Sequence, residues 1–191
     1  MSRSPGHGAA QPEPLSSLRR PDERDRVDPD LPSRDLPVLG WKEQVSLPDL
    51  GIDRLRAKLD TGARSSALHV ESMEEIGQHE FAGERLPLVR FELLVGARRD
   101  PQRRTVEAPV VAHKRVRDTR ARPELRPVIR TRITCGPVDA VADVTLTSRT
   151  GMNFRMLLGR LTLEHRCLVD PARGYLHSPV PPRPASSPRP M

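Results

Sequence analysis

The residues of this chain best suited to chemistry stand together, as Asp60-Thr61-Gly62. A carboxylate can serve as a general acid or base when it is held rigidly at the mouth of a cleft. The same triplet also makes an ordinary turn, because an Asp side chain bonds its own backbone and glycine accepts a positive φ. The triplet alone favours the turn, so the surrounding sequence must distinguish the two interpretations.

The element that must position Asp60 is the run that precedes it. Residues 54–59 alternate between charged and apolar side chains, with Leu55, Ala57 and Leu59 on one side. This period of two predicts a half-buried β-strand. The strand would end directly at Asp60 and present its carboxylate in a defined place.

The rest of the folded part shows the same β pattern. The clearest unit is a hairpin over 127–147, turned by Gly136-Pro137, in which Ile129, Ile133 and Cys135 share one face of the first strand. Alternate residues of the return strand, 140–146, face the same core. No 15-residue window carries a helical stripe, so the sequence predicts an all-β fold.

Weaker signals complete the predicted order. Residues 73–81 and 86–95 predict a second hairpin, and the polar stretches 96–104 and 117–123 predict loops. A strand is predicted over 105–116, and its Pro109 favours an edge position because proline cannot donate to a ladder. Further short elements are expected at 38–41, 45–47, 154–160, 161–165 (one or two turns of helix) and 167–176.

Proline is concentrated at both ends of the 191-residue chain, which contains 21 prolines. Residues 1–36 lack hydrophobic periodicity, and 178–191 form a proline-rich extended tail, so both ends are predicted to be disordered. One folded domain is expected over 37–177. No apolar run approaches the length of a membrane helix and the start lacks a secretory h-region, so a cytoplasmic location without membrane association is expected.

The net charge of +7 and the pI near 10.5 invite acidic partners, such as nucleic acid or a glutamate-rich peptide. The basic residues are nearly all arginine, a skew that codon bias produces as easily as function. Aromatic side chains, the usual stacking platforms for bases, make up only 3% of the chain. Nucleic-acid binding is therefore supported by charge alone.

Metal and nucleotide motifs are absent from the sequence. There is no HExxH, and the histidines of the predicted domain show no i, i+4 pairing. Cys135 and Cys167 form no CxxC pair and are expected to be small buried residues of a reducing compartment. No phosphate-binding loop or dinucleotide fingerprint is present, so neither zinc, ATP nor another cofactor is expected.

The order of motifs changes the interpretation of the triplet. A strand ending in Leu59-Asp60-Thr61-Gly62-Ala63, then hairpins, then Met156-Leu157-Leu158-Gly159-Arg160 resembles the retropepsin-like aspartic proteases. With the blocks at 40–48 and 126–131, the chain is similar to a bacterial and archaeal family commonly labelled "ATP-dependent zinc protease". That family is linked to an ATP-grasp ligase that adds glutamates to a ribosomal protein. The resemblance covers about residues 38–176 and implies a retropepsin-like β-barrel with one short C-terminal helix.

An aspartic protease needs two carboxylates that share one proton and activate a water between them. Since this chain has one Asp-Thr-Gly, the resemblance implies a symmetric homodimer in which each subunit lends Asp60. It assigns Thr61 to a bond across the dimer axis and Gly62 to close approach of substrate. The strand Leu157–Gly159 would pack beneath the Asp60 loop.

The remaining site residues predicted by this resemblance and by charge form two groups. Leu158, Gly159 and Arg160 would support the site. Ala63, Arg64, Arg126, Arg130 and Arg155 would line a cleft for substrate, because arginine binds carboxylates bidentately.

Two residues need separate comment. Retroviral enzymes carry a carboxylate at the position of Arg64, where it pairs with the arginine that here is Arg160. Two arginines cannot pair, so contacts at the dimer or at the substrate must differ. His69 is expected to be a hydrogen-bonded structural histidine.

The sequence therefore predicts a homodimeric aspartic-type peptidase that hydrolyses peptide bonds with water activated between two Asp60 carboxylates. The glutamate-ligase association points to glutamate-rich peptides or tails as substrate. The first alternative is a non-catalytic module of the same fold that binds acidic peptide or ribosomal protein. The second is a nucleic-acid binder.

Overall fold

The structure is a computed structural model that describes residues 36–178 apart from 82, 98–99, 117–123 and 149–152. The predicted loop 117–123 and nearly all of the two predicted disordered ends lie outside the described residues. Within the described ranges, no helix is long and apolar enough to cross a membrane.

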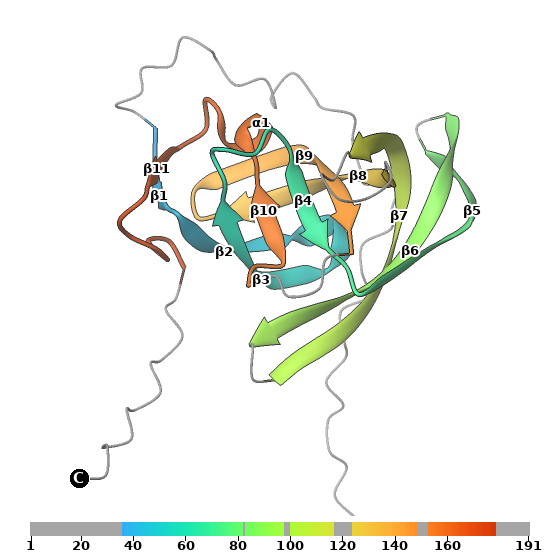
Figure 1. Ribbon diagram of the computed structural model, residues 1–191, viewed down its shortest axis with the longest axis horizontal. Helices are drawn as coiled ribbons and strands as arrows, with labels where there is room; N and C mark the ends of the chain where they lie inside the picture. Colours follow the sequence, from blue (N-terminus) through green and yellow to red (C-terminus); the bar gives the residue numbers. More distant parts are fainter. Residues whose placement is uncertain (1–35, 82, 98–99, 117–123, 149–152, 179–191) are drawn as a thin grey trace, which may run out of the picture.

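Six strands form a closed, mixed β-barrel (Figure 1). In order around the barrel the strands are β2 (Lys42–Leu47), β3 (Ile52–Leu59), β10 (Met156–Leu158), β4 (Ser66–His69), β9 (Val138–Thr147) and β8 (Glu124–Cys135). The barrel is closed because Ser46 of β2 pairs with Thr134 of β8. Strands β3 and β10 run parallel, as do β4 and β9, while the other neighbours are antiparallel.

The sheet continues beyond the barrel through three long strands, β7 (Asp100–Val116), β6 (Glu84–Ala97) and β5 (Ser72–Phe81). A separate two-stranded parallel sheet joins β1 (Val38–Gly40) to β11 (Leu168–Asp170). The described residues also form a 3-10 turn, η4 (Pro48–Leu50), and a short helix, α1 (Arg160–Leu163).

The apolar faces of the strands fill the barrel, which is why the period of two could be recognised. In β3, Leu55, Ala57 and Leu59 are 2%, 0% and 4% exposed, whereas Arg56 and Lys58 lie on the outer face. The expected hairpin over β8 and β9 is also present, with the chain turning at residues 136–137. The core includes Leu39, Val45, Leu47, Leu68, Ile129, Ile133, Val144, Leu146, Met156 and Leu158. The predicted all-β barrel with one short α-helix is confirmed.

Two predictions about the middle of the chain were wrong. Residues 96–104 are not a loop, because β6 and β7 stay paired to Ala97 and Asp100 at the end of their hairpin. This hairpin extends past the barrel (Figure 1), so it carries exposed polar residues and an Arg103–Glu92 ion pair in place of apolar alternation. Strand β7 is not an edge strand either. Its Pro109 is the last residue paired with β6 before the strand moves to β8.

The C-terminal segment is attached to the barrel through Glu43, which the sequence analysis overlooked. This carboxylate is fully buried and accepts hydrogen bonds from Gly40 N at 2.9 Å, Leu176 N at 2.7 Å and Ser178 Oγ at 2.6 Å. Backbone and hydroxyl donors thus satisfy a charge that would be costly to bury alone. The segment that includes Leu176 and Ser178 is thus joined to β2 through one buried carboxylate.

Candidate active site

Asp60 follows β3 directly and is fixed by the backbone around it. Its own N–H donates to the Leu158 carbonyl at 2.8 Å. Its Oδ1 atom accepts from the backbone N–H of Gly62 at 3.1 Å and of Ala63 at 3.3 Å. The turn chemistry that made Asp-Thr-Gly ambiguous is thus present, and it orients a carboxylate that remains 25% exposed.

The second oxygen of Asp60 faces a lysine. Lys58 Nζ lies 3.2 Å from Asp60 Oδ2, and the lysine side chain is 42% exposed. Residues two apart on a strand share a face, so the placement follows from β3 itself. The sequence analysis missed Lys58, although this spacing was a signal that could have identified it.

Strand β10 and helix α1 support the Asp60 loop from beneath. A Cβ atom on Gly159 would lie 2.5 Å from the Ser65 carbonyl carbon, so only glycine permits this approach without movement of the backbone. The hydroxyl of Ser66 accepts from Gly159 N at 3.1 Å and lies 2.7 Å from Thr162 Oγ1. These contacts place Leu158 and Gly159 against the loop.

Arg160 binds the loop in a way that the sequence did not reveal. Its Nη1 atom donates to the carbonyls of Thr61 at 2.9 Å and Gly62 at 3.0 Å. Its backbone N–H donates to the Ala63 carbonyl at 2.9 Å, and the next N–H, of Leu161, donates to the Arg64 carbonyl at 3.0 Å. Arg160 therefore has backbone partners in its own chain and needs no carboxylate at position 64.

The Arg64 side chain is exposed at the start of the segment that leads into β4. Arg126 lies on β8 and is connected to the Asp60 loop through its neighbour in the ladder. It pairs with Lys114 across β7 and β8, and Lys114 Nζ contacts Ser65 Oγ at 2.5 Å. Directly opposed residues point to the same face of a sheet, so Arg126 shares the face that reaches Ser65.

Arg130 and Arg155 are engaged elsewhere. Arg130 forms a two-pronged ion pair with Asp143 at 2.7 and 3.1 Å on the outer face of β8 and β9, and this carboxylate raises the pKa of Arg130. Arg155 binds Glu71 at 2.8 Å, at the end of β4 opposite to the Asp60 loop. The structure does not bring these two side chains together with Asp60.

His69 lies at the same far end of β4 and is buried. Its Nδ1 atom is 3.3 Å from the Thr147 carbonyl, and its Nε2 atom is 3.7 Å from Glu71 Oε1. These contacts fit the structural role that the sequence favoured for His69.

The described residues do not fit a zinc site. No three His, Cys, Asp or Glu side chains gather among them in a way that could hold a metal ion. Cys135 and Cys167 are buried, and burial is the main cause that raises the pKa of these thiols, to about 12 and about 11 respectively. Protonated thiols are poor metal ligands, because the thiolate is the form that binds.

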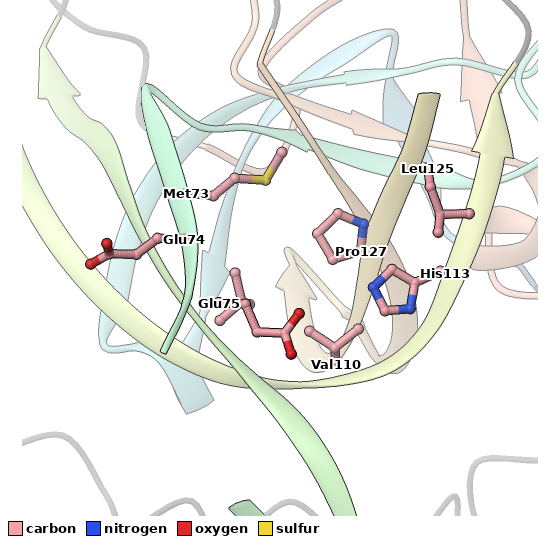
Figure 2. A pocket seen from close by; sticks show the side chains of 8 residues that line it. Met73, Glu74, Glu75, Val110, His113, Leu125 and Pro127 are labelled. Atoms are coloured by element: carbon pink, nitrogen blue, oxygen red, sulfur yellow. The ribbon is translucent and has the colours of Figure 1, made fainter. Parts of the chain in front are cut away.

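A pocket of about 240 Å³ lies between β5 and the β7–β8 pair (Figure 2). Met73 and Glu75 line it from β5, and His113, Leu125 and Pro127 line it from the opposite side. His113 pairs with Pro127 across the ladder, and their neighbours Lys114 and Arg126 point to the other face. The pocket therefore opens on the face of β7–β8 that points away from Ser65 and the Asp60 loop.

A mixed six-stranded barrel whose one Asp-Thr-Gly loop packs against a short strand followed by Gly-Arg is typical of the retropepsin-like class of aspartic peptidases. The chain belongs to the family described as "Retropepsin-like aspartic endopeptidase RimB", whose model matches residues 38–179. The family expected from the sequence is thus confirmed.

The chain is also similar to parts of longer proteins. The chain is 36% identical over 137 residues to a "Probable alpha-L-glutamate ligase" of Parasynechococcus marenigrum, covering 70% of this chain and 28% of the relative. It is 32% identical to a protein of the same description from Shewanella pealeana, covering 72% and 29%. The chain therefore spans less than a third of the curated relatives that it matches.

A solved structure supports the fold. A crystal structure of a protein of unknown function from Legionella pneumophila superposes on this chain with a TM-score of 0.58, and the two sequences are 30% identical. The match covers 74% of this chain and 98% of that one.

Proposed function

We propose that this protein is an aspartic-type peptidase that acts as a symmetric homodimer, with one Asp60 from each subunit. The observation that carries the proposal is the way in which the Asp60 side chain is held and exposed. One carboxylate oxygen is fixed by two backbone donors, and the side chain remains partly exposed beside the Leu158–Gly159 strand. One chain supplies one such carboxylate, and the reaction requires two.

In the proposed reaction the two Asp60 side chains share one proton. The ionised carboxylate takes a proton from water while the water oxygen attacks the peptide carbonyl carbon. The protonated carboxyl group gives its proton to the carbonyl oxygen, which forms a tetrahedral diol. When the diol collapses, the C–N bond breaks and the proton taken from water passes to the leaving amine. One diol hydroxyl gives its proton to the carboxylate that had protonated the carbonyl oxygen, which restores the starting pair.

The loop tip is arranged to meet a second copy. Thr61 and Gly62 are exposed, and Arg160 holds their carbonyls within the same chain. We assign Thr61 to the contact between the two loops across the two-fold axis. With its backbone fixed from behind, the tip can approach its partner without first having to become ordered.

The substrate that we propose is a glutamate-rich peptide or protein tail, handled in the cytoplasm. The support is indirect: similar sequences form part of proteins described as probable alpha-L-glutamate ligases. The cations Arg64 and Arg160 beside the Asp60 loop, with Lys114 at Ser65, would favour an acidic chain.

The test compares wild-type protein with Asp60→Asn on an oligoglutamate peptide and on its glutamine analogue. Wild type is expected to cleave the acidic peptide, and the variant is expected to be inactive while keeping its fold by circular dichroism. Retained cleavage by a clean preparation of Asp60→Asn would refute the assignment.

Mixing the two proteins tests the dimer. After subunits exchange in an equal mixture, about one quarter of the dimers are wild type on both sides, and activity should fall to that fraction. Activity that stays proportional to the wild-type fraction would place the whole site in one chain.

If wild type binds the peptide without cleaving it and Asp60→Asn binds equally well, the protein is a binding module instead. Binding to RNA that weakens steeply with salt would favour the nucleic-acid alternative.

A further inference from the structure

The outer face of β3 carries a lysine whose position next to Asp60 has a consequence for substrate choice. Lys58 Nζ lies 3.2 Å from Asp60 Oδ2, the carboxylate oxygen that the loop backbone does not bind. An ammonium group has three N–H donors, and this contact uses one of them. With 42% of its side chain exposed, Lys58 can offer the others to a ligand.

Lys58 stands in a row of positive charge. Lys42 is its direct partner across the β2–β3 ladder, and Arg56 precedes it by two residues on the same face. Like charges placed directly opposite one another on a sheet are destabilising. Among the described residues, Asp60 is the one carboxylate paired with Lys58. An additional anion at this face would therefore be favoured.

The two flanking cations are held in place by aromatic rings. Lys42 Nζ lies 4.5 Å from the centre of the Trp41 ring and 5.3 Å from that of Tyr175. Arg56 lies over the Phe154 ring at 5.3 Å. Cation–π contacts of this kind fix a charge without neutralising it. The positive row is thus ordered before any ligand arrives, with Lys58 as the member nearest to Asp60.

We propose that Lys58 is a specificity-determining residue that binds the side-chain carboxylate of the substrate residue flanking the scissile bond. This inference rests on the proposed peptidase function. A peptide bond seated on Asp60 brings its flanking residue within reach of an ammonium that already touches that carboxylate. Side chains of an extended peptide recur on one face about every 6.6–7 Å, which is also the spacing of Arg56 and Lys58 along β3.

The ammonium also accounts for discrimination against neutral substrates. A substrate carboxylate draws Lys58 toward itself and leaves Asp60 Oδ2 open to the attacking water. A glutamine in the same place has no charge to compete with Asp60 for the ammonium. Sites built for a polar partner reject an analogue that leaves their polar groups without that partner.

The experiment measures kcat/KM for two peptides that differ only by glutamate or glutamine at the flanking position. For wild type we expect the glutamate peptide to be preferred by about tenfold or more, the size of one charge-assisted hydrogen bond. In Lys58→Met the ratio should fall to about one. Lys58→Glu should instead prefer a third peptide, which carries lysine at the flanking position.

The ratio is the informative quantity, because a general loss of Asp60 function lowers the rates for both peptides equally. The matched control is Arg132→Met, which removes an exposed cation from the outer face of β8, where it pairs with Asp139. This control should keep the wild-type ratio. A wild-type ratio in Lys58→Met would overturn the inference while leaving the peptidase assignment intact.

A binding measurement separates the two proposals if no peptide is cleaved. Calorimetry in the Asp60→Asn background should show tighter binding of the glutamate peptide, and the added Lys58→Met change should abolish that preference. Such a result would support the role of Lys58 even where cleavage has failed. Equal affinities for the two peptides before and after the Lys58 change would refute it.

Discussion

Replacing Gly159 with alanine tests whether β10 packs against the Asp60 loop as closely as the structure shows. The added Cβ would lie 2.5, 2.6 and 2.8 Å from the carbonyl carbon, carbonyl oxygen and nitrogen of Ser65. All three are backbone atoms, so no side-chain rotation relieves the contact. The backbone of Gly159 is extended, at φ −87 and ψ 172, a conformation that alanine adopts readily. The expected cost is therefore purely steric.

Overpacking of this kind costs about 1–3 kcal/mol. For a domain of this size the melting temperature should fall by roughly 3–12 °C. Because Ser65 follows the loop, its displacement should also misplace Asp60, and a shift of about 1 Å can reduce catalysis about a hundredfold. We therefore expect Gly159→Ala to lose more activity than its remaining folded fraction explains.

Gly174 provides a matched control for this substitution. A Cβ there would also meet atoms at 2.6 Å, but these are methylene carbons of the Lys42 side chain, which shift at lower cost than backbone atoms. Both changes reduce the entropy of the unfolded chain equally, so that term cancels in the comparison. The assays are thermal unfolding by circular dichroism and cleavage of the oligoglutamate peptide. Equal melting temperatures and equal activity in the two variants would show that the contact with Ser65 is not as tight as described.

Three further predictions concern the loop and the buried thiols. Arg160→Met removes the hydrogen bonds to the Thr61 and Gly62 carbonyls. We expect kcat/KM to fall at least tenfold, while the free energy of unfolding falls by only about 1 kcal/mol. Arg160→Lys should recover part of the activity. Similar losses of stability and activity would contradict a positioning role. Because the pKa of Cys135 is raised to about 12 and that of Cys167 to about 11, iodoacetamide should label the native chain slowly at pH 8 and the unfolded chain rapidly. The same raised pKa values make the stability of the fold depend on pH. The stability that the protonated thiols contribute is intact below 9.0, the pKa of a thiol in the unfolded chain, and is lost as the pH rises toward 11 to 12. Melting temperatures measured from pH 8 to 11 would detect this loss.

The parts of the fold that could be predicted are those where one face of a strand is buried and the other is not. Strand β3 and the β8–β9 hairpin meet that condition, and their alternation was visible in the sequence. The end of the β6–β7 hairpin does not meet it, because it extends beyond the barrel and has little core to face. Its polar residues therefore resembled a loop, although backbone pairing and the Arg103–Glu92 ion pair make it a ladder.

The contacts of the candidate site also divide into those that could be predicted from the sequence and those that could not. Asp60 and Gly159 could be located from local sequence, since both belong to contiguous motifs. The partners of Arg160 could not, because they are backbone carbonyls, and every residue type carries those. The same limit hid Glu43, two of whose donors, the backbone N–H of Leu176 and the hydroxyl of Ser178, lie more than 130 positions away. Interactions with backbone leave little trace in residue identity.

These backbone contacts have a consequence for how the active dimer would form. The Asp60 loop is held by Leu158, Gly159 and Arg160 of the same chain, and none of these contacts requires a partner subunit. Each half of the proposed site is therefore complete in conformation and lacks only the second carboxylate. Association then has little loop entropy to overcome, so a weak dimer interface can suffice when substrate spans both halves. On this view Arg64 is released from the pairing role that a carboxylate has at this position in retroviral enzymes. Its exposed side chain is left available to an acidic substrate.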